Sequence, residues 1–284
     1  MKAATGSRLS WPYLTGLFLL VAVPTLMAIG IAFTEFSGIR APRFVGLDNF
    51  SRMLHDDLFW KALGNSAVYV AIAVPLRLVA AVGFALLLNR RSRGVGLARP
   101  VAYLPSVIPD AAYALLWLWI LNPLYGPFAA FTRSVGLGDP GTLTDPWATR
   151  IAIAVMAAFQ IGEAFVVALA ARRSISPSLY EAAVVDGASP FFALRRITLP
   201  SMAPILALLV LRDIVLALQI NFVPALLITE GGPRYATTYL SYFIYRNAFG
   251  YFRLGYASAV SMTMFVLTAA AIYGQYRLVR RWRV

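Results

Sequence analysis

Six long apolar segments constrain the fold of this chain more than any other feature of its sequence. A helix needs about 20 apolar residues to cross a bilayer, where its backbone polar groups can bond only to one another. Of the 284 residues, 60% are hydrophobic and only 13% are charged. We therefore expect an all-α membrane protein, a single domain over residues 1–284. Its six transmembrane helices are predicted at about residues 13–34, 66–88, 100–121, 151–171, 202–221 and 256–276.

The distribution of basic residues predicts which side of the membrane each loop faces. A formal net charge of +13 would suggest nucleic-acid binding in a water-soluble protein, but in a membrane protein it is expected from the bias of Lys and Arg toward cytoplasmic loops. Three loops carry nine Lys or Arg residues, diluted by seven acids. The termini and the other two loops, 89–99 and 172–200, carry fourteen: Lys2, Arg8, Arg90, Arg91, Arg93, Arg99, Arg172, Arg173, Arg195, Arg196, Arg277, Arg280, Arg281 and Arg283. Both termini are therefore expected in the cytoplasm, and no nucleic-acid partner is expected.

The residue types that are missing exclude several kinds of chemistry. The chain has no Cys and a single histidine, His55, so disulfides, zinc sites and Cys/His catalysis are excluded and no metal site is expected. Lys2 and Lys61 are its only lysines, and neither follows the glycines of a phosphate-binding loop. If ATP drives this protein, another subunit must hydrolyse it.

The loop 172–200 contains a structured insert between two apolar segments, LYEAAVVDGASPFFALRRITLP. Ser176 before a proline predicts a helix start, and the helix should run to about Asp186. Gly187 is typical of the left-handed residue that ends a helix, and Ser189 before a second proline predicts another start. These residues predict two short helices at the membrane surface. On this basis alone, an interfacial connector between two spans explains the loop equally well.

The spacing within this loop resembles a known family signature. Glu181, Ala182, Ala183 and Gly187, followed by ITLP at 197–200, resemble the EAA-x3-G-x9-I-x-LP pattern of the integral-membrane permeases of binding-protein-dependent ABC importers. The resemblance implies that the first helix inserts into a groove of a separate ATPase subunit and transmits its motion to the membrane helices. The ATPase-coupling residues implied by it are Glu181, Ala182, Ala183, Asp186 and Gly187.

Other stretches resemble the carbohydrate-uptake branch of the same family. They are Asn65 and Tyr69, YLPSVIPDAAYALLW at 103–117, ITEGGP at 228–233 and FGYFRLGYASAVS at 249–261. The family often has Phe-Asp before the GGP stretch, whereas this chain has Phe222-Val223. The resemblance implies a type I importer permease with a cytoplasmic coupling helix, carrying a sugar or related polyhydroxylated solute as a non-catalytic subunit.

The resemblance also implies a set of partners and a location. The partners are a second homologous permease subunit, two ATPase subunits that hold ATP and Mg, and an extracytoplasmic solute-binding protein. This chain itself would bind no cofactor. It would lie among the lipids of a bacterial or archaeal plasma membrane as a multi-pass protein.

Four charged residues fall near the middle of predicted spans: Arg77, Glu163, Arg212 and Asp213. Ionised groups at that depth are costly unless they are paired or hydrated, so we expect them in the bundle interior. Arg212 and Asp213 are sequence neighbours about 100° apart on a helix and are poorly placed to pair with each other. Pairs between helices, such as Arg77 with Asp213 or Arg212 with Glu163, are expected instead. Such a network is either structural or a polar lining of a translocation path.

Further polar and aromatic residues extend the path hypothesis. Gln160 and Glu163 are three apart and would share one helix face, whereas Arg212 and Gln219 are seven apart and would share another. Asn221, Phe222 and Trp117 supply amide and aromatic groups that suit sugar hydroxyls and sugar rings. The candidate path residues are Trp117, Gln160, Glu163, Arg212, Gln219, Asn221 and Phe222. Each is also compatible with ordinary packing.

Two other classes of function compete with this interpretation. A self-sufficient secondary transporter or channel for a small polar solute would be favoured by inverted repeats and substrate-coupled carboxylates. The two halves of the chain show no such symmetry, and the insert in loop 172–200 has no role in that mechanism. A membrane-embedded enzyme is disfavoured by the lack of Cys, the single His and the absence of a carboxylate or hydroxyl triad.

Overall fold

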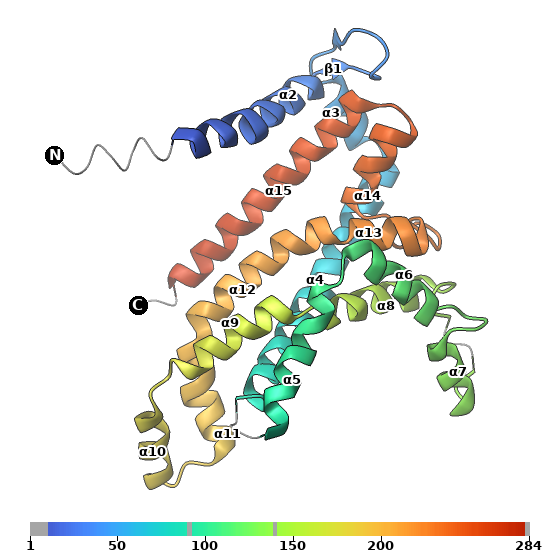
Figure 1. Ribbon diagram of the computed structural model, residues 1–284. Helices are drawn as coiled ribbons and strands as arrows, with labels where there is room; N and C mark the ends of the chain where they lie inside the picture. The colour runs from blue at the N-terminus through green and yellow to red at the C-terminus, as the bar shows by residue number, and fades with distance from the viewer. Residues whose placement is uncertain (1–10, 90–92, 139–140, 282–284) are drawn as a thin grey trace, which may run out of the picture. The chain divides into compact units, whose positions relative to one another are not determined.

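The computed structural model describes residues 11–89, 93–138 and 141–281, most of which are helical (Figure 1). Within these ranges the only strands are β1 (Thr34–Glu35) and β2 (Arg43–Phe44), which pair antiparallel. Of the residues that predict the orientation, Lys2, Arg8, Arg90, Arg91 and Arg283, with the acid Asp139, lie outside the described residues. The contacts gather the chain into two compact units, and each is described by itself.

The helices follow the predicted apolar segments. Their bounds are α2 (Val23–Ala32), α3 (Asp48–Leu54), α4 (Asp57–Leu87), α5 (Arg93–Tyr103), α6 (Asp110–Ile120), α7 (Pro127–Ser134), α8 (Pro146–Phe159), α9 (Gly162–Arg173), α10 (Pro177–Val185), α11 (Pro190–Ala193), α12 (Leu199–Ile220), α13 (Phe222–Pro224), α14 (Leu240–Tyr245) and α15 (Leu254–Arg281). Four continuous helical stretches are long and apolar enough to cross a bilayer: Trp11–Ala32, Asp57–Leu87, Pro190–Thr229 and Leu254–Arg277. They correspond to the first, second, fifth and sixth predicted spans.

The third and fourth predicted spans are broken helices. The helical stretch Gly94–Val107 meets α6 at a bend of 100°, and α8 meets α9 at a bend of 54°. The first bend lies at Ile108, whose extended backbone is the conformation favoured before a proline, here Pro109. The second lies at Gln160 and Ile161, just before Gly162. Six spans result when each bent pair is one span.

The helix that follows the second bend, α9, begins with a glycine, Gly162, because there is no room for a side chain at this position. A Cβ atom there would lie 2.6 Å from the hydroxyl oxygen of Ser106 and 2.8 Å from the ring of Tyr103. The Gly162 N–H donates to the same Ser106 hydroxyl at 2.8 Å. The two broken spans therefore touch at their breaks, and only glycine permits that approach.

The larger unit comprises Lys61–Tyr242 and the described residues from Ala270 onward. One of its hydrophobic clusters joins α4, α6 and α8 through Tyr69, Tyr113 and Ile153. A second joins α4, α9 and α12 through Ala85, Phe165 and Met202. Small buried alanines recur in both clusters and allow these helices to approach closely, as is common between membrane helices. The core of this unit therefore fixes the helices that carry the candidate site.

The ITEGGP stretch forms part of a loop that is held by α4 and α8. The Asn65 amide donates to the carbonyl of Tyr235 at 2.6 Å and accepts from the Arg150 guanidinium at 2.6 Å. Arg150 also donates to the carbonyl of Ala236 at 3.1 Å. Gly231 has a φ of +82°, and a Cβ there would lie 2.6 Å from the Thr238 hydroxyl, so this position requires glycine. Asn65 and the ITEGGP stretch both resemble the carbohydrate-uptake permeases, and Asn65 is thus hydrogen-bonded directly to the loop that contains this stretch.

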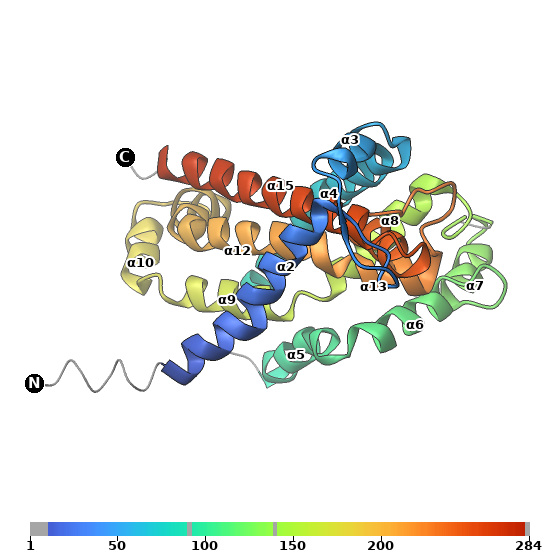
Figure 2. The same ribbon diagram turned by 90° about the horizontal axis from the view of Figure 1, so that it is seen from above.

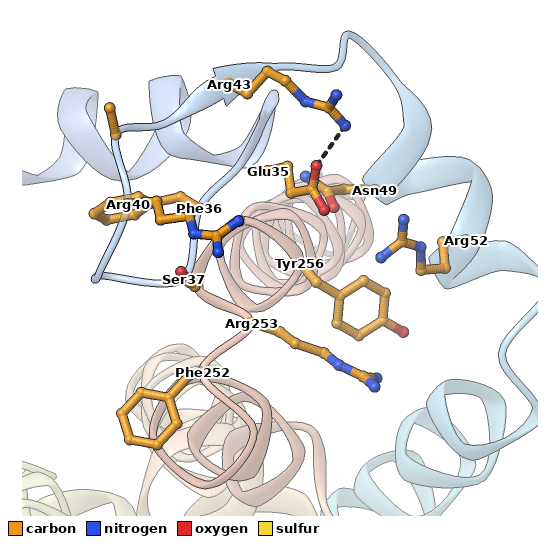
Figure 3. A pocket seen from close by; sticks show the side chains of 12 residues that line it. Glu35, Phe36, Ser37, Arg40, Arg43, Asn49, Arg52, Phe252, Arg253 and Tyr256 are labelled. Carbon is orange, nitrogen blue, oxygen red and sulfur yellow. Dashed lines mark hydrogen bonds and ion pairs between the residues drawn. The ribbon is translucent and has the colours of Figure 1, made fainter.

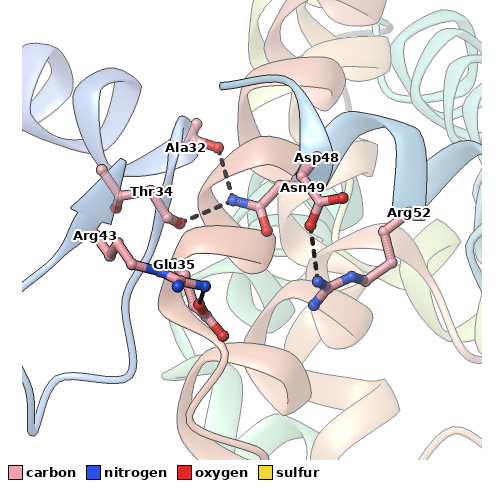
Figure 4. A network of polar contacts seen from close by, with 7 residues as sticks. All are labelled: Ala32, Thr34, Glu35, Arg43, Asp48, Asn49 and Arg52. Carbon is pink, nitrogen blue, oxygen red and sulfur yellow. Dashed lines mark hydrogen bonds and ion pairs between the residues drawn. The ribbon is translucent and has the colours of Figure 1, made fainter. Parts of the chain in front are cut away.

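The smaller unit comprises the described residues up to Trp60 together with Phe243–Ala269. Its organising residue is Asn49 in α3, which is 4% exposed and whose amide donates to the carbonyls of Ala32 and Thr34, both at 2.9 Å (Figure 4). At Gly255 a Cβ would lie 1.9 Å from the carbonyl oxygen of Thr34. The outer ends of the first and last spans therefore meet through backbone contacts that leave no room for a side chain.

Candidate functional site

The insert in loop 172–200 forms two short helices separated by a sharp turn, as predicted. Gly187 ends α10 in the left-handed conformation with a φ of +71°. The Ala188 N–H donates to the carbonyl of Ala183 at 2.8 Å, and the Gly187 N–H donates to that of Val184 at 3.0 Å. This pattern satisfies the last carbonyls of the helix and fixes the direction in which the chain leaves it.

The two predicted helix starts differ in their capping. Ser189 caps α11, because its hydroxyl accepts from the N–H of Phe192 at 3.2 Å. Ser176 precedes α10 as predicted, but its side chain does not cap the helix. Its hydroxyl lies 2.7 Å from that of Ser178 instead. Ser176 therefore marks the start of the helix by its position, while its hydroxyl is engaged by Ser178.

The nine residues of α10 include none that is buried by the rest of the described chain. Glu181, Ala182 and Asp186 are exposed, and so are Val184 and Val185, at 73% and 86%. A helix this short is marginal in water without tertiary packing. A helix whose apolar and acidic side chains are exposed in the isolated chain is typical of a helix that a partner subunit covers in a complex. All five predicted coupling residues lie on this helix or in the turn that ends it.

Tyr180 attaches α10 to the membrane helices. Its hydroxyl lies 2.8 Å from the hydroxyl of Thr198, at the start of α12, and the Arg172 guanidinium lies 4.3 Å from its ring centroid, at the end of α9. Figures 1 and 2 both show α10 at the ends of α9 and α12, away from α13. Sequence reasoning missed this residue. An aromatic side chain in a helix of mainly small residues was the available signal.

A buried polar cluster joins α4, α12 and the bend between α8 and α9. Arg77 is 7% exposed and Asp213 is 0% exposed, and the Arg77 Nε atom lies 3.9 Å from the Asp213 Oδ2 atom. The Arg77 Nη2 atom donates at 3.0 Å to the carbonyl of Gln160, where α8 ends. The predicted pair between Arg77 and Asp213 is therefore present, and the same guanidinium also satisfies a carbonyl at the bend.

The second predicted pair is also present, but on an exposed face. Glu163 and Arg212 form an ion pair, with 62% and 37% of their side chains exposed. Arg212 additionally lies 3.4 Å from Asp213, so the expectation that these neighbours would not pair was wrong. The long arginine side chain folds back over the adjacent carboxylate. The expectation that Glu163 lies in the interior of the bundle was also wrong for this chain by itself.

The Glu163–Arg212 pair borders a cavity of about 330 Å³. Its other lining residues are Tyr103, Val166, Val167 and Leu209. One ion pair therefore lies within a largely apolar wall contributed by α5, α9 and α12. The combination provides one charged hydrogen-bonding group of each sign next to apolar surface.

The other five candidate path residues do not line this cavity. Gln160 ends α8 whereas Glu163 begins α9 beyond the 54° bend, so the expectation that they share a helix face was wrong. Gln219 is exposed on α12. The three remaining residues, Trp117, Asn221 and Phe222, are buried or partly buried around the first hydrophobic cluster.

The side-chain contacts of these three residues show how they are held. Trp117 contacts Phe159 with ring centroids 5.3 Å apart, and the Asn221 side-chain Oδ1 atom accepts from the Ser241 hydroxyl at 2.6 Å. Phe222 packs against the same cluster as Trp117. The seven candidate residues therefore do not form one site.

Comparison with known proteins identifies close relatives over most of the chain. A family model described as "Binding-protein-dependent transport system inner membrane component" matches residues 2–284. The "Probable ABC transporter permease protein YesP" of Bacillus subtilis is 33% identical over 262 residues, covering 90% of this chain and 84% of that protein. The "Trehalose/maltose transport system permease protein MalF" of Thermococcus litoralis is 30% identical over 271 residues, covering 94% and 90%. The "sn-glycerol-3-phosphate transport system permease protein UgpA" of Yersinia enterocolitica is 30% identical over 238 residues, covering 84% and 81%.

Solved structures share the fold. A chain of a bacterial ABC transporter involved in the import of the acidic polysaccharide alginate matches with a TM-score of 0.84 at 24% identity, covering 99% of both chains. A chain of the bacterial alginate transporter in complex with an alginate pentasaccharide-bound periplasmic protein matches with a TM-score of 0.82 at 24% identity, covering 99% of this chain and 98% of that one. The predicted fold class, an all-α membrane protein with importer-permease architecture, is confirmed.

Proposed function

The chain belongs to the family of binding-protein-dependent transport system inner membrane components, and we propose that it forms half of the path by which a sugar or related polyhydroxylated solute crosses the membrane. It is a multi-pass membrane permease subunit of an ABC importer. Relatives at 30% identity or more include permeases for trehalose/maltose and for sn-glycerol 3-phosphate, both small polyhydroxylated solutes. The choice of solute class rests on these relatives.

The observation that carries the path proposal is the exposed Glu163–Arg212 ion pair. Arg212 lies ten positions after the start of the predicted span at 202–221, roughly 15 Å along the helix, which is near mid-depth of a bilayer. Charged groups at that depth face a protein interior or a water-filled cavity rather than lipid. Because this chain leaves the pair exposed, its face must be covered by a second permease subunit or must line an aqueous path between the two. The cavity beside the pair supports the second arrangement.

Glu163→Gln is expected to change solute preference without unfolding the protein. The variant keeps the shape of the side chain but removes the charge that holds the Arg212 guanidinium, so the hydrogen-bonding pattern of the cavity changes. The measurement is the ratio of uptake rates for two competing sugars in cells that express the complete transporter. Glu230→Gln, the same change at an exposed loop residue that does not line the cavity, is the matched control and should leave the ratio unchanged. An unchanged ratio together with lower expression would mean that the pair is only structural.

An ABC importer uses separate subunits for solute capture, membrane passage and ATP hydrolysis, and this chain would need partners for the tasks that it does not perform. We propose a second homologous permease, two ATPase subunits that bind ATP and Mg, and an extracytoplasmic solute-binding protein. The exposed, acidic and apolar surface of α10 supports ATPase docking, and the family description supports the binding protein. This chain contributes no catalytic group. A secondary transporter, the alternative, would leave the exposed surface of α10 unexplained.

The test of this function is reconstitution of the chain with its co-expressed subunits in vesicles. ATP hydrolysis is measured while a panel of solute-binding proteins, each loaded with its solute, is added in turn. One binding protein with its sugar should raise hydrolysis and drive uptake together. Uptake that continues without ATP and without any binding protein would favour the secondary transporter.

The docking proposal requires that α10 lies in the cytoplasm. The excess of Lys and Arg in loop 172–200 and at the two termini supports this orientation. A reporter enzyme that is active only outside the cytoplasm should remain inactive when it is fused after residue 180 and should be active when fused after residue 136. The reverse result would overturn both the orientation and the docking proposal.

A further inference from the structure

A separate cavity of about 650 Å³ lies in the smaller unit, within the region bounded by β1, the loop that follows it, α3 and the start of α15 (Figure 3). Four of the residues that line it are arginines: Arg40, Arg43, Arg52 and Arg253. Glu35 is the only acid in the lining. None of the candidate path or coupling residues lines this cavity.

Two of the four arginines are paired with carboxylates of the same unit and two are not. Arg43 lies 2.6 Å from Glu35, and Arg52 lies 2.9 Å from Asp48 (Figure 4). Among the described residues, no carboxylate lies within ion-pair distance of Arg40 or Arg253. The cavity therefore has an excess of positive charge. The Arg253 guanidinium lies 5.7 Å from the ring centroid of Tyr251, which leaves its N–H groups able to donate to an anion, as are those of Arg40.

The walls of the cavity are held in place by buried polar and backbone contacts. Asn49 fixes α3 to the end of the first span through its two hydrogen bonds. The Tyr256 hydroxyl donates to the carboxylate of Asp56 at 2.7 Å, so this acid is turned toward a partner of its own. The Gly255 N–H donates to the carbonyl of Phe36 at 3.2 Å, which ties the arginine-bearing loop to the start of α15. The backbone segments that carry the arginines are therefore held in place by these hydrogen bonds.

The position of the cavity along the chain places it at a membrane surface. Its lining residues begin at Glu35, three positions after the first span ends at Ala32. Its last four lining residues flank Leu254, where the last span begins: Phe252, Arg253, Gly255 and Tyr256. Phe252 is 58% exposed at its edge, and aromatic side chains are enriched at this depth of a membrane protein. In the first span, none of the residues in its most apolar window is buried, so apolar surface leads from the bilayer toward the cavity.

We propose that this cavity binds the phosphate of an anionic phospholipid headgroup, with Arg40 and Arg253 as its principal ligands. Guanidinium groups donate paired hydrogen bonds that match the oxygens of a phosphate. The lipid's acyl chains would run along the exposed apolar surface of the first span. Continuity with that surface favours a lipid over an acidic protein, because a protein would need access through water and would leave the apolar surface uncovered.

The test measures which phospholipid stays bound to the purified protein. Wild type and Arg40→Gln/Arg253→Gln are extracted, with their co-purifying subunits, from vesicles of equal parts phosphatidylglycerol and phosphatidylcholine, and retained lipids are counted by native mass spectrometry. Wild type should retain phosphatidylglycerol preferentially. The double variant should lower that preference by about 30-fold, since each basic group near an anionic lipid contributes roughly fivefold.

Arg234→Gln is the matched control, because Arg234 is an exposed loop arginine outside the cavity, and it should retain lipid as wild type does. Equal retention of phosphatidylglycerol by wild type and the double variant would overturn the proposal. So would unchanged lipid retention combined with weaker docking of the solute-binding protein, which would assign the arginines to an acidic protein surface. Inorganic phosphate provides a third arm: if it stabilises the lipid-free wild type as well as phosphatidylglycerol does, the site belongs to a soluble anion.

Discussion

Replacing Gly187 with valine is expected to abolish solute uptake while the protein remains in the membrane at near-normal levels. Gly187 has a φ of +71°, and nothing lies within 4 Å of where its Cβ would be. The substitution therefore causes no collision and costs only the strain of a left-handed residue, about 1–2 kcal/mol, and more for a β-branched side chain. That cost is too small to unfold six spans. It is large enough to change how α10 leaves the membrane helices.

The effect on transport is expected to be large because Gly187 joins α10, the helix that we propose docks on the ATPase, to the rest of the permease. If α10 continues past its present end, its direction relative to α12 changes. Tyr180 then cannot keep its contact with Thr198 and at the same time leave α10 in the same groove of the ATPase. ATP hydrolysis stimulated by the binding protein and solute uptake should both fall to background. The measurements are uptake in cells and stimulated hydrolysis in vesicles, with membrane levels determined in parallel.

Comparison of Glu181→Lys with Gly187→Val separates docking from transmission. Glu181→Lys reverses an exposed charge on α10 and should weaken co-purification of the ATPase, whereas Gly187→Val should leave the ATPase bound. Gly136→Val is the matched control, because Gly136 also has a positive φ, +78°, with open space around its Cβ, but lies in the loop after α7. Normal uptake in both α10 variants, with the ATPase still bound, would return this loop to an ordinary connector.

Arg77→Met is expected to destabilise the folded permease more than any exposed substitution. Arg77 and Asp213 are both buried, so removing the guanidinium leaves a carboxylate whose nearest remaining positive charge is Arg212, and it also leaves the Gln160 carbonyl without its donor. Leaving a buried charge without a partner costs about 3–5 kcal/mol. Because Arg212 still lies 3.4 Å from Asp213, we expect a loss at the lower end of that range. The midpoint of thermal unfolding in detergent should fall by roughly 10 °C.

A second substitution tests whether the lost charge balance is the cause. Arg77→Met with Asp213→Asn should recover part of the stability, because the carboxylate that needed a partner is gone. Arg234→Met on the exposed loop is the control and should change the free energy of unfolding by no more than about 0.5 kcal/mol. Equal destabilisation by the single and double variants would show that loss of packing, rather than an unpaired charge, explains the effect.

Several features of the candidate site were predictable from local sequence. The turn at Gly187 follows from a glycine placed after a helix-forming stretch, and the structure has the predicted left-handed conformation there. The pairs Arg77–Asp213 and Arg212–Glu163 follow from the cost of unpaired charge at mid-depth. These predictions succeed because each depends on one large contribution to the free energy that can be read from a few residues. For Gly187 it is the steric restriction of the backbone, and for the ion pairs it is the cost of transferring a charge into hydrocarbon.

Other features depended on contacts between distant residues. The bend at Gln160 separated it from Glu163 on different helices, although their spacing fits one helix face. The break occurs where Gly162 meets Ser106, a residue 56 positions earlier. Tyr180 gained its role from Thr198 and Arg172, and the cavity lined by arginines arose where the loop after the first span meets the start of the last. Hydrophobic periodicity in the sequence does not indicate which distant residues will be in contact.

The sequence by itself determined that this chain is a membrane protein, where its spans lie and which loop forms the two short helices α10 and α11. Apolar length and the penalty for unsatisfied backbone in hydrocarbon leave few other solutions. Only the tertiary structure decided that two spans are broken, that Glu163 and Arg212 lie on an exposed face, and that Asn65 and Arg150 hold the ITEGGP loop. The physical reason is that these depend on which helix surfaces pack together, and packing is decided by the sum of many weak contacts over the whole fold.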